Sequence, residues 1–143
     1  MATVTAPRFD DVKVGDALKP IVLPPISRHQ LALYCGGSGD HNPIHVDIDF
    51  AKKFGFKDVF AHGMLTMGMT GSLLTDTVGD GRLTKFGGRF TSQVWPGDTL
   101  TATATIEAIR EEGGEQLADF TVTTVNQDGR EVFSGHATAR LDP

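Results

Sequence analysis

An apolar segment at residues 63–77 limits the folds open to this chain more than any other feature. Its hydrophobic residues fall on nearly every side of a helix, which predicts a helix buried within the rest of the molecule. Gly68 and Gly71 each cost about 1 kcal/mol relative to alanine inside a helix. We therefore expect that their small size lets other backbone approach the helix closely. A helix of this kind needs further structure wrapped around it.

After Asp80 and Gly81 the pattern changes from helical spacing to alternation. Apolar and polar residues alternate over residues 99–107, which indicates a strand with one buried face. Further strands are predicted at residues 83–94, 117–125 and 132–141, with turns at 95–98, 111–114 and 128–129. Consecutive strands joined by short turns pair antiparallel. The fold class is predicted to be α+β, with an antiparallel sheet of about five strands curled over the long helix.

The N-terminal half is predicted to contain one short strand and two capped helices. The strand, residues 18–23, is followed by two prolines, which cannot donate to a sheet ladder. Ser27 and Gln30 form a capping box that begins a helix, and the glycine pair after Cys35 is expected to end it. The second helix is predicted over residues 47–54, with its first residue as the cap.

The composition predicts one globular domain, residues 1–143, with an ordinary hydrophobic fraction of 39%. A net charge of -5 argues against a nucleic-acid or polybasic membrane role. The lone Cys35 excludes an intramolecular disulfide and a cysteine-based zinc site, and a free thiol fits the cytoplasm. No segment reaches the length of a membrane span, and the N-terminus lacks the apolar run of a signal peptide.

The densest group of reactive side chains lies in the loop of residues 38–46. Asp40 and His45 are five positions apart, and Pro43 stiffens the loop between them by fixing its own φ and favouring an extended Asn42. Two titratable groups that share one water form a general acid–base arrangement, worth typically about 10²–10⁴-fold in rate. Asn42 has no charge to lose, so it is predicted to hold the loop geometry or to orient a neighbour.

Gly63 is expected to begin the long helix and to contribute to the same chemistry. A helix N-terminus presents free N–H groups and partial positive charge, which stabilise a developing oxyanion. The absence of a side chain lets a substrate carbonyl come close. An activated water beside an oxyanion hole suits the addition or removal of water next to a polarised carbonyl.

Simpler interpretations of these residues stay open. Asp40 can serve only to close a turn, and His45 can be a structural histidine. His62 is either structural or a support for the site. The remaining alternative is a metal site with the ligands Asp40, His41, His45 and Asp47. Their spacing matches no usual zinc pattern, so no metal is predicted.

Tyr34, the segment SGDHNPIH at residues 38–45, and Ala51 together form one motif. This motif resembles the hydratase-2 motif of MaoC-like (R)-specific enoyl-CoA hydratases and 3-hydroxyacyl dehydratases. Segments AHGML, residues 61–65, and RFTSQVWPGD, residues 89–98, also resemble blocks of that family. The likeness runs in order over nearly the whole chain.

The resemblance implies a hotdog fold, in which the sheet wraps the long helix, usually in a dimer. It implies that Asp40 and His45 bind and activate water, with support from Asn42. It also implies that the Gly63 N–H binds the thioester oxygen. The reaction would be the reversible hydration of a trans-2-enoyl thioester to the (R)-3-hydroxyacyl product, the work of a hydro-lyase. No cofactor is implied beyond the CoA or acyl-carrier-protein group of the substrate.

Two other functions are considered: a non-catalytic subunit of a heterodimeric acyl dehydratase, and a hotdog thioesterase. The complete Asp/Asn/His set argues against the first, and release of free CoA thiol would identify the second. Unless the chain is a subunit of such a heterodimer, it is expected to form a homodimer or a higher homo-oligomer. The cations considered for the CoA phosphates are Lys52, Lys53, Arg82, Lys85 and Arg89.

Overall fold

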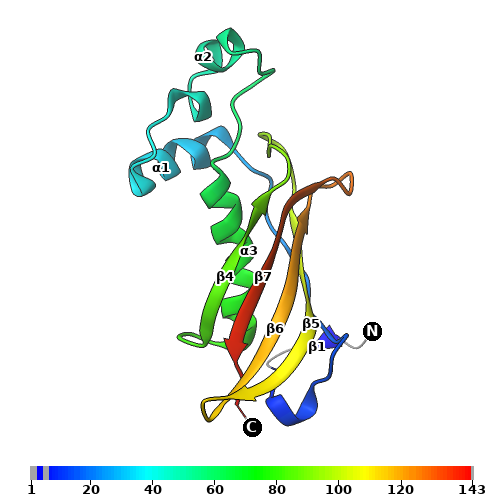
Figure 1. Cartoon of the computed structure of the whole chain (residues 1–143). Helices are drawn as coiled ribbons and strands as arrows, with labels where there is room; N and C mark the ends of the chain where they lie inside the picture. Colours follow the sequence, from blue (N-terminus) through cyan, green and yellow to red (C-terminus); the bar gives the residue numbers. More distant parts are fainter. Residues whose placement is uncertain (1–2, 5–6, 143) are drawn as a thin grey trace.

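The structure is a computed structural model that describes residues 3–4 and 7–142. Most of its sheet consists of four long strands: β4 (Leu83–Phe90), β5 (Thr101–Glu112), β6 (Glu115–Val125) and β7 (Glu131–Arg140). Three two-residue strands complete it: β1 (Thr3–Val4), β2 (Ala17–Leu18) and β3 (Ile21–Val22). Figure 1 shows the sheet curling around the long helix α3 (Gly63–Val78).

The strand order in the sheet is β1-β2-β5-β6-β7-β4, and β3 also pairs with β5. The four long strands pair antiparallel, which confirms the predicted α+β class. The expected count of about five strands was too low. The predicted strand at 18–23 divides into β2 and β3, and β1, which pairs parallel with β2, is too short to show alternation in the sequence.

Strand β4 ends at Phe90, and not at Val94 as the sequence predicts. Beyond Phe90 one more backbone bond joins the chain to β7, from the N–H of Thr91 to the carbonyl oxygen of Val132 at 3.0 Å. Farther on, the carbonyl oxygen of Val94 accepts a hydrogen bond of 2.8 Å from the N–H of Ala61. Val94 therefore binds the segment that leads into α3. This bond fixes the backbone just before the first residue of that helix.

Helix α1 (Arg28–Ser38) begins as predicted, because the Ser27 hydroxyl accepts from the N–H of Gln30 at 3.0 Å. The helix continues beyond the predicted end at Cys35 through two helical glycines. It stops at Gly39, whose left-handed φ of 76° suits a residue without a side chain. The ends of α1 thus follow its two caps, and Asp40 comes directly after the second.

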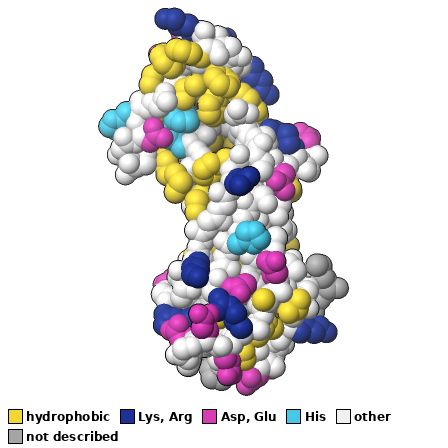
Figure 2. Space-filling model, viewed as in Figure 1, with side chains coloured by type: hydrophobic (Ala, Val, Ile, Leu, Met, Phe, Trp, Pro, Cys, Tyr) yellow, Lys and Arg dark blue, Asp and Glu magenta, His cyan; other side chains and the backbone are white. Residues whose placement is uncertain are grey.

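The short helices η2 (Pro43–His45) and α2 (Ile48–Lys53) follow α1, and a 3₁₀ turn, η1 (Phe9–Asp11), lies near the N-terminus. Asp47 caps α2 as predicted, because its Oδ1 accepts from two backbone N–H groups at 3.0 Å. Figure 1 places α1 and α2 together at the end of the molecule where α3 begins, opposite the chain termini. Figure 2 shows hydrophobic side chains gathered at that end and charged ones at the other.

Helix α3 is less completely buried than its composition predicts. Leu73 and Leu74 are fully buried, whereas Met64 is 58% exposed and Gly68 is exposed too. Helix α3 thus has one face that is buried and a second apolar face that is exposed in the single chain. In the part of the chain that the structure describes, no helix is both long and apolar enough to cross a membrane.

The close approach of backbone that was expected at Gly68 and Gly71 is not found: nothing lies within 4 Å of a Cβ on Gly68, and an aromatic ring packs on Gly71. A Cβ on Gly71 would lie 3.1 Å from the Phe86 ring, and one on Gly63 would lie 2.8 Å from the Phe90 ring. Both rings come from β4. The glycine positions therefore set how closely β4 packs on α3.

A pair of glycines, Gly88 in β4 and Gly135 in β7, lies under the buried ring of Phe133. A Cβ on Gly88 would lie 2.6 Å from this ring and 2.5 Å from the carbonyl oxygen of Ser134. The neighbouring Gly87 has open space at the same position. The two strands therefore approach each other more closely than a side chain on Gly88 permits.

We expect Gly88→Ala to lower the free energy of unfolding by about 1–3 kcal/mol, because the methyl group overpacks a site bounded by backbone. Gly87→Ala is the matched control, since it changes the unfolded chain in the same way and meets nothing within 4 Å. Urea unfolding midpoints of the two variants measure the difference. Equal midpoints would contradict the packing argument.

Candidate active site

His45, the last residue of η2, has its tautomer fixed by a backbone carbonyl. Its Nδ1 lies 2.7 Å from the carbonyl oxygen of Phe60. Because a carbonyl oxygen only accepts, Nδ1 carries the proton, and neutral His45 has its lone pair on Nε2. The Phe60 ring stands edge-on to the imidazole, with centroids 5.3 Å apart. Phe60 thus sets both the tautomer and the orientation of His45.

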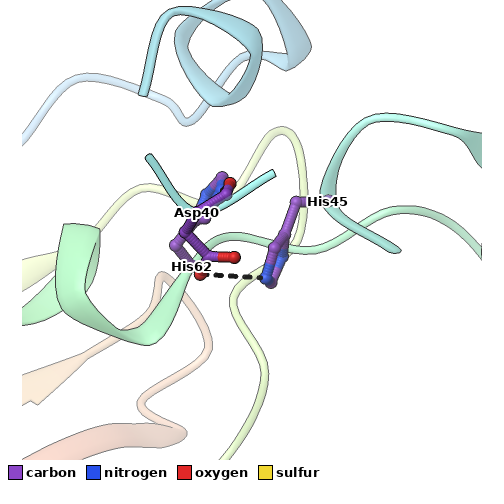
Figure 3. Close-up of side chains that lie close together, drawn as sticks. All are labelled: Asp40, His45 and His62. Atoms are coloured by element: carbon purple, nitrogen blue, oxygen red, sulfur yellow. Dashed lines mark hydrogen bonds and ion pairs between the residues drawn. The ribbon is translucent and has the colours of Figure 1, made fainter. Parts of the chain in front are cut away.

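The two carboxylate oxygens of Asp40 have different neighbours. Oδ1 accepts from the N–H of Asn42 at 3.3 Å, which closes a local turn. Oδ2 faces His45 Nε2 at 3.9 Å, as Figure 3 shows. This distance is too long for a direct hydrogen bond and short enough for one water to donate to both acceptors. The turn-closing and water-binding interpretations of Asp40 are therefore compatible.

Asn42 connects the two reactive residues through the loop backbone. Its side-chain Oδ1 accepts from the N–H of Ile44 at 3.1 Å and caps η2. Its own N–H donates to Asp40, and its carbonyl oxygen accepts from the N–H of His45 at 3.2 Å. This geometry agrees with the predicted part of Asn42 in holding the loop.

His62 joins the cluster from the residue before α3 and is 1% exposed. Its ring stacks on that of His45, with centroids 3.9 Å and planes 27° apart. Its Nε2 lies 3.2 Å from the backbone carbonyl oxygen of Asp40 and 3.5 Å from Cys35 Sγ. Burial, followed by the charge of His45, lowers the pKa of His62, and the contacts with Asp40 oppose this shift only in part. Both effects favour the neutral form of His62, which lies close to Asp40 and His45 (Figure 3).

Gly63 is the first residue of α3, so its N–H belongs to the N-terminal groups without an intrahelical partner. It follows His62 in the chain, which places the helix N-terminus beside the stacked imidazoles. A cavity of about 340 Å³ adjoins Gly63. Its lining is Phe60, Ala61, Gly63, Thr66, Phe90, Thr91, Ser92, Gln93, Val94 and Val132.

The sequence of residues 11–129 matches the MaoC like domain family. The chain belongs to this family. An (R)-specific enoyl-CoA hydratase from Rhodospirillum rubrum is 35% identical over 135 residues, which cover 93% of this chain and 90% of that protein. The solved structure of the (R)-hydratase from A. caviae involved in PHA biosynthesis matches with a TM-score of 0.81 and 27% identity, covering 92% of this chain and 98% of that one.

A third solved structure, a chain of the ChsH1–ChsH2 complex from Mycobacterium tuberculosis, matches with a TM-score of 0.79. It is 21% identical and covers 90% of this chain and 98% of that one, so it shows a likeness in fold alone. Together the comparisons confirm the MaoC-like resemblance and the hotdog fold that it implied. They also support the expected class of enzyme, a hydro-lyase.

In this MaoC-like chain, Asp40, His45 and His62 offer ligand atoms within 4.8 Å of one another, as a metal site would. The rings of the two histidines stack with planes 27° apart, and His62 Nε2 lies 3.2 Å from the carbonyl oxygen of Asp40. Because that oxygen only accepts, Nε2 carries a proton and is not free to bind an ion. Of the other ligands considered from the sequence, Asp47 caps α2 and His41 is exposed. The geometry favours an acid–base pair over a metal centre.

The cations considered for the CoA phosphates lie in different parts of the MaoC-like fold. Arg82 pairs with Asp142 just beyond the C-terminal end of α3, which is about 24 Å long from its rise per residue. Arg89 is exposed and precedes Phe90, whose ring packs on Gly63. Arg89 is therefore much nearer to the site than Arg82 is.

Two parts of the site were missed or left open from the sequence. The carbonyl group of Phe60 holds His45, and a backbone group leaves no signal in the residue types. His62 was left undecided between a structural and a supporting residue. Its position directly before Gly63 was the signal, because the residue before the helix start must lie close to the helix N-terminus.

Proposed function

We propose that this protein catalyses the reversible hydration of a 2-enoyl thioester to the (R)-3-hydroxyacyl thioester, with water activated by Asp40 and His45. The observation that carries the proposal is the orientation of His45. The bond from Nδ1 to the carbonyl oxygen of Phe60 turns the basic Nε2 toward the Asp40 carboxylate, 3.9 Å away. Two acceptors at this separation suit a single water that donates one hydrogen to each.

In the hydration direction the water oxygen forms a bond to C3 of the enoyl group, and one water O–H bond breaks. Its proton moves to His45 Nε2 or to Asp40, and the π electrons of the double bond move toward C2 and the thioester oxygen. The dyad then delivers a proton to C2, which restores the carbonyl group. Dehydration follows the same steps in reverse, so one pair of residues serves as acid and base.

The negative charge that develops on the thioester oxygen is proposed to be stabilised by the N–H of Gly63. This N–H lies at a helix N-terminus, where the partial positive charge of the helix favours an anion. The cavity of about 340 Å³ that adjoins Gly63 is the proposed site of the acyl chain. The similarity to the (R)-specific enoyl-CoA hydratase from Rhodospirillum rubrum favours a CoA thioester.

The proposed acting form is a homodimer, for which two features of the single chain provide support. Strand β4 is an edge of the sheet, so its outer backbone groups are free to pair. Met64 near the start of α3 is 58% exposed, and Phe90 at the end of β4 is 49% exposed. A groove of about 380 Å³ runs between α3 and β4 and is lined by Met64, Met67, Gly68, Gly71, Ser72, Thr75, Leu83 and Phe86. A second copy paired along β4 would cover this apolar face.

We expect the purified chain to hydrate crotonyl-CoA and longer enoyl-CoA thioesters, because one sequence supplies the whole acid–base pair. The measurements are the loss of enoyl absorbance, chiral analysis of the product and the mass in solution. An (R)-3-hydroxyacyl product from a species of two copies is the expected result. The same assay with an acyl-carrier-protein thioester identifies the carrier.

Three outcomes would contradict the proposal. Release of free CoA thiol from an acyl-CoA would identify a thioesterase, in which the same water attacks the thioester carbon. Turnover that appears only after a second hotdog chain is added would identify a partner subunit. An (S) product would contradict the proposed (R)-3-hydroxyacyl product.

A further inference from the structure

We propose that His62 is a positioning residue for the Asp40–His45 pair and that it acts as a neutral imidazole with its proton on Nε2. The inference rests on the proposed hydration reaction, in which Asp40 and His45 hold the water. His62 acts on that water through two neighbours. One is the backbone carbonyl group of Asp40, and the other is the ring of His45.

The loop that carries Asp40 has few other long-range contacts. Residues 36–43 are all exposed. Within residues 3–4 and 7–142, the other hydrogen bonds of residues 39–42 stay between Cys35 and His45. The bond from His62 Nε2 to the Asp40 carbonyl oxygen spans 22 residues. It therefore ties the solvent-facing turn to the start of the buried helix.

The same bond determines the protonation state of His62. A carbonyl oxygen accepts only, so Nε2 donates and Nδ1 is left as the acceptor nitrogen. Nδ1 is buried, and the described part of the chain gives it no hydrogen-bond partner. Protonation would create a buried N–H without an acceptor, beside a second imidazole. Both costs disfavour the cation, in agreement with the lowered pKa of His62.

A neutral His62 adds no positive charge beside the ring of His45. With ring centroids 3.9 Å apart, two imidazolium ions would repel each other strongly, so the stacked pair holds one proton more readily than two. The titratable groups that face His62 are Tyr34 and Cys35 from α1, Asp40 from the loop, and His45 from η2. The carboxylate of Asp40 faces His45, and this arrangement lets His45 carry the proton that the reaction moves.

Two substitutions test separately the hydrogen bond of His62 to the Asp40 carbonyl oxygen and the stacking of its ring on His45. His62→Gln keeps an N–H donor near the position of Nε2, whereas His62→Phe keeps the ring and loses the donor. We expect His62→Phe to lower kcat by about 10–100-fold through displacement of Asp40, with KM changed by less than about twofold. His62→Gln should recover a large part of kcat. The exposed His29 provides the control substitution His29→Gln, which should leave kcat unchanged.

A merely structural histidine would give a different result. A structural role would lower the amount of folded protein and leave the kcat of each folded molecule unchanged. Thermal unfolding of each variant is therefore measured beside its kcat per folded molecule. Wild-type kcat in folded His62→Phe would overturn the inference. Equal losses in kcat for His62→Phe and His62→Gln would overturn it as well, because the donor would then have no separate effect.

A measurement without substrate keeps the inference distinct from the proposed function. Nitrogen-15 NMR of the wild-type imidazoles at a pH near 6.5, the ordinary histidine pKa, should show His62 neutral with its proton on Nε2. A protonated His62, or a proton on Nδ1, would overturn the inference even if the enzyme hydrates enoyl thioesters. A neutral Nε2–H tautomer with no hydratase activity would instead contradict the proposed function alone.

The same protonation state predicts how stability depends on pH. Because the pKa of folded His62 lies below the unfolded value of about 6.5, the unfolded chain binds more protons between the two values. This contribution to stability is complete above pH 6.5 and is lost as the pH falls toward the folded pKa. We expect acidification to shift the urea midpoint of the wild type further than that of His62→Phe. Equal shifts would contradict the lowered pKa.

Discussion

Asp40→Asn and His45→Ala are each expected to lower kcat for enoyl-CoA hydration by about 10²–10⁴-fold, the usual contribution of a positioned acid or base. Asp40→Asn keeps an oxygen that can accept from the N–H of Asn42, so the turn is preserved while the charge facing His45 is lost. His45→Ala removes the nitrogen that the Asp40 carboxylate faces. Steady-state kinetics with crotonyl-CoA measures both effects.

The control for His45 keeps the hydrogen bond made by Nδ1 and removes only Nε2. His45→Asn can retain an N–H near Nδ1 for the carbonyl oxygen of Phe60, but it has no group at the position of Nε2. It should therefore fold as the wild type does and be about as inactive as His45→Ala. For Asp40→Asn, the matched control is Asp49→Asn on the exposed surface of α2, and this variant should be active. Near-normal kcat in Asp40→Asn or His45→Asn would refute the proposed dyad.

Gly63→Pro is expected to lower kcat by about 10²–10³-fold, the effect of removing one oxyanion donor. Proline has no N–H, and it is well tolerated at the first position of a helix, where that N–H has no intrahelical partner. The preceding residue, His62, already has φ -57° and ψ 135°, which suits a residue before proline. The helix should therefore form while the proposed donor to the thioester oxygen is lost.

Gly63→Ala is the reference for this experiment, because both variants add a Cβ that would lie 2.8 Å from the Phe90 ring. Any displacement of Phe90 is common to the two, and only the proline variant loses the N–H. The ratio of their kcat values therefore reports the loss of the N–H together with the proline ring atoms that take its place. Gly68→Ala adds a methyl group farther along α3 where nothing lies within 4 Å, and it should retain activity. Equal kcat for Gly63→Pro and Gly63→Ala would show that this N–H does not bind the oxyanion.

The elements of the fold that have strong local signals could be predicted from the sequence. Ser27, Asp47 and the apolar segment at α3 placed three helix starts correctly, because caps and apolar periodicity act within a few residues. The long antiparallel strands followed from alternation and turns. The two-residue strands β1, β2 and β3 have no period to detect, so the size of the sheet was underestimated.

The end of β4 and the packing of α3 depend on contacts between distant segments. Val94 has the apolar character of a strand residue, yet its carbonyl oxygen binds Ala61. The glycines of α3 indicated close approach, but Phe86 and Phe90 proved to be the neighbours. Sequence pattern shows that room is needed at a position and does not show which group from another element will use it.

For the candidate site, the sequence by itself determined which groups are present: an acid, an imidazole and a helix-opening glycine in two short segments. Only the tertiary structure decided how those groups are arranged. It brought the carbonyl group of Phe60 to His45 Nδ1 and the ring of His62 beneath His45, across 15 residues in the first case. Residue types fix which protons can move, because that is a property of each side chain. The tautomer and the direction in which the lone pair points are set by partners that meet only when the chain folds.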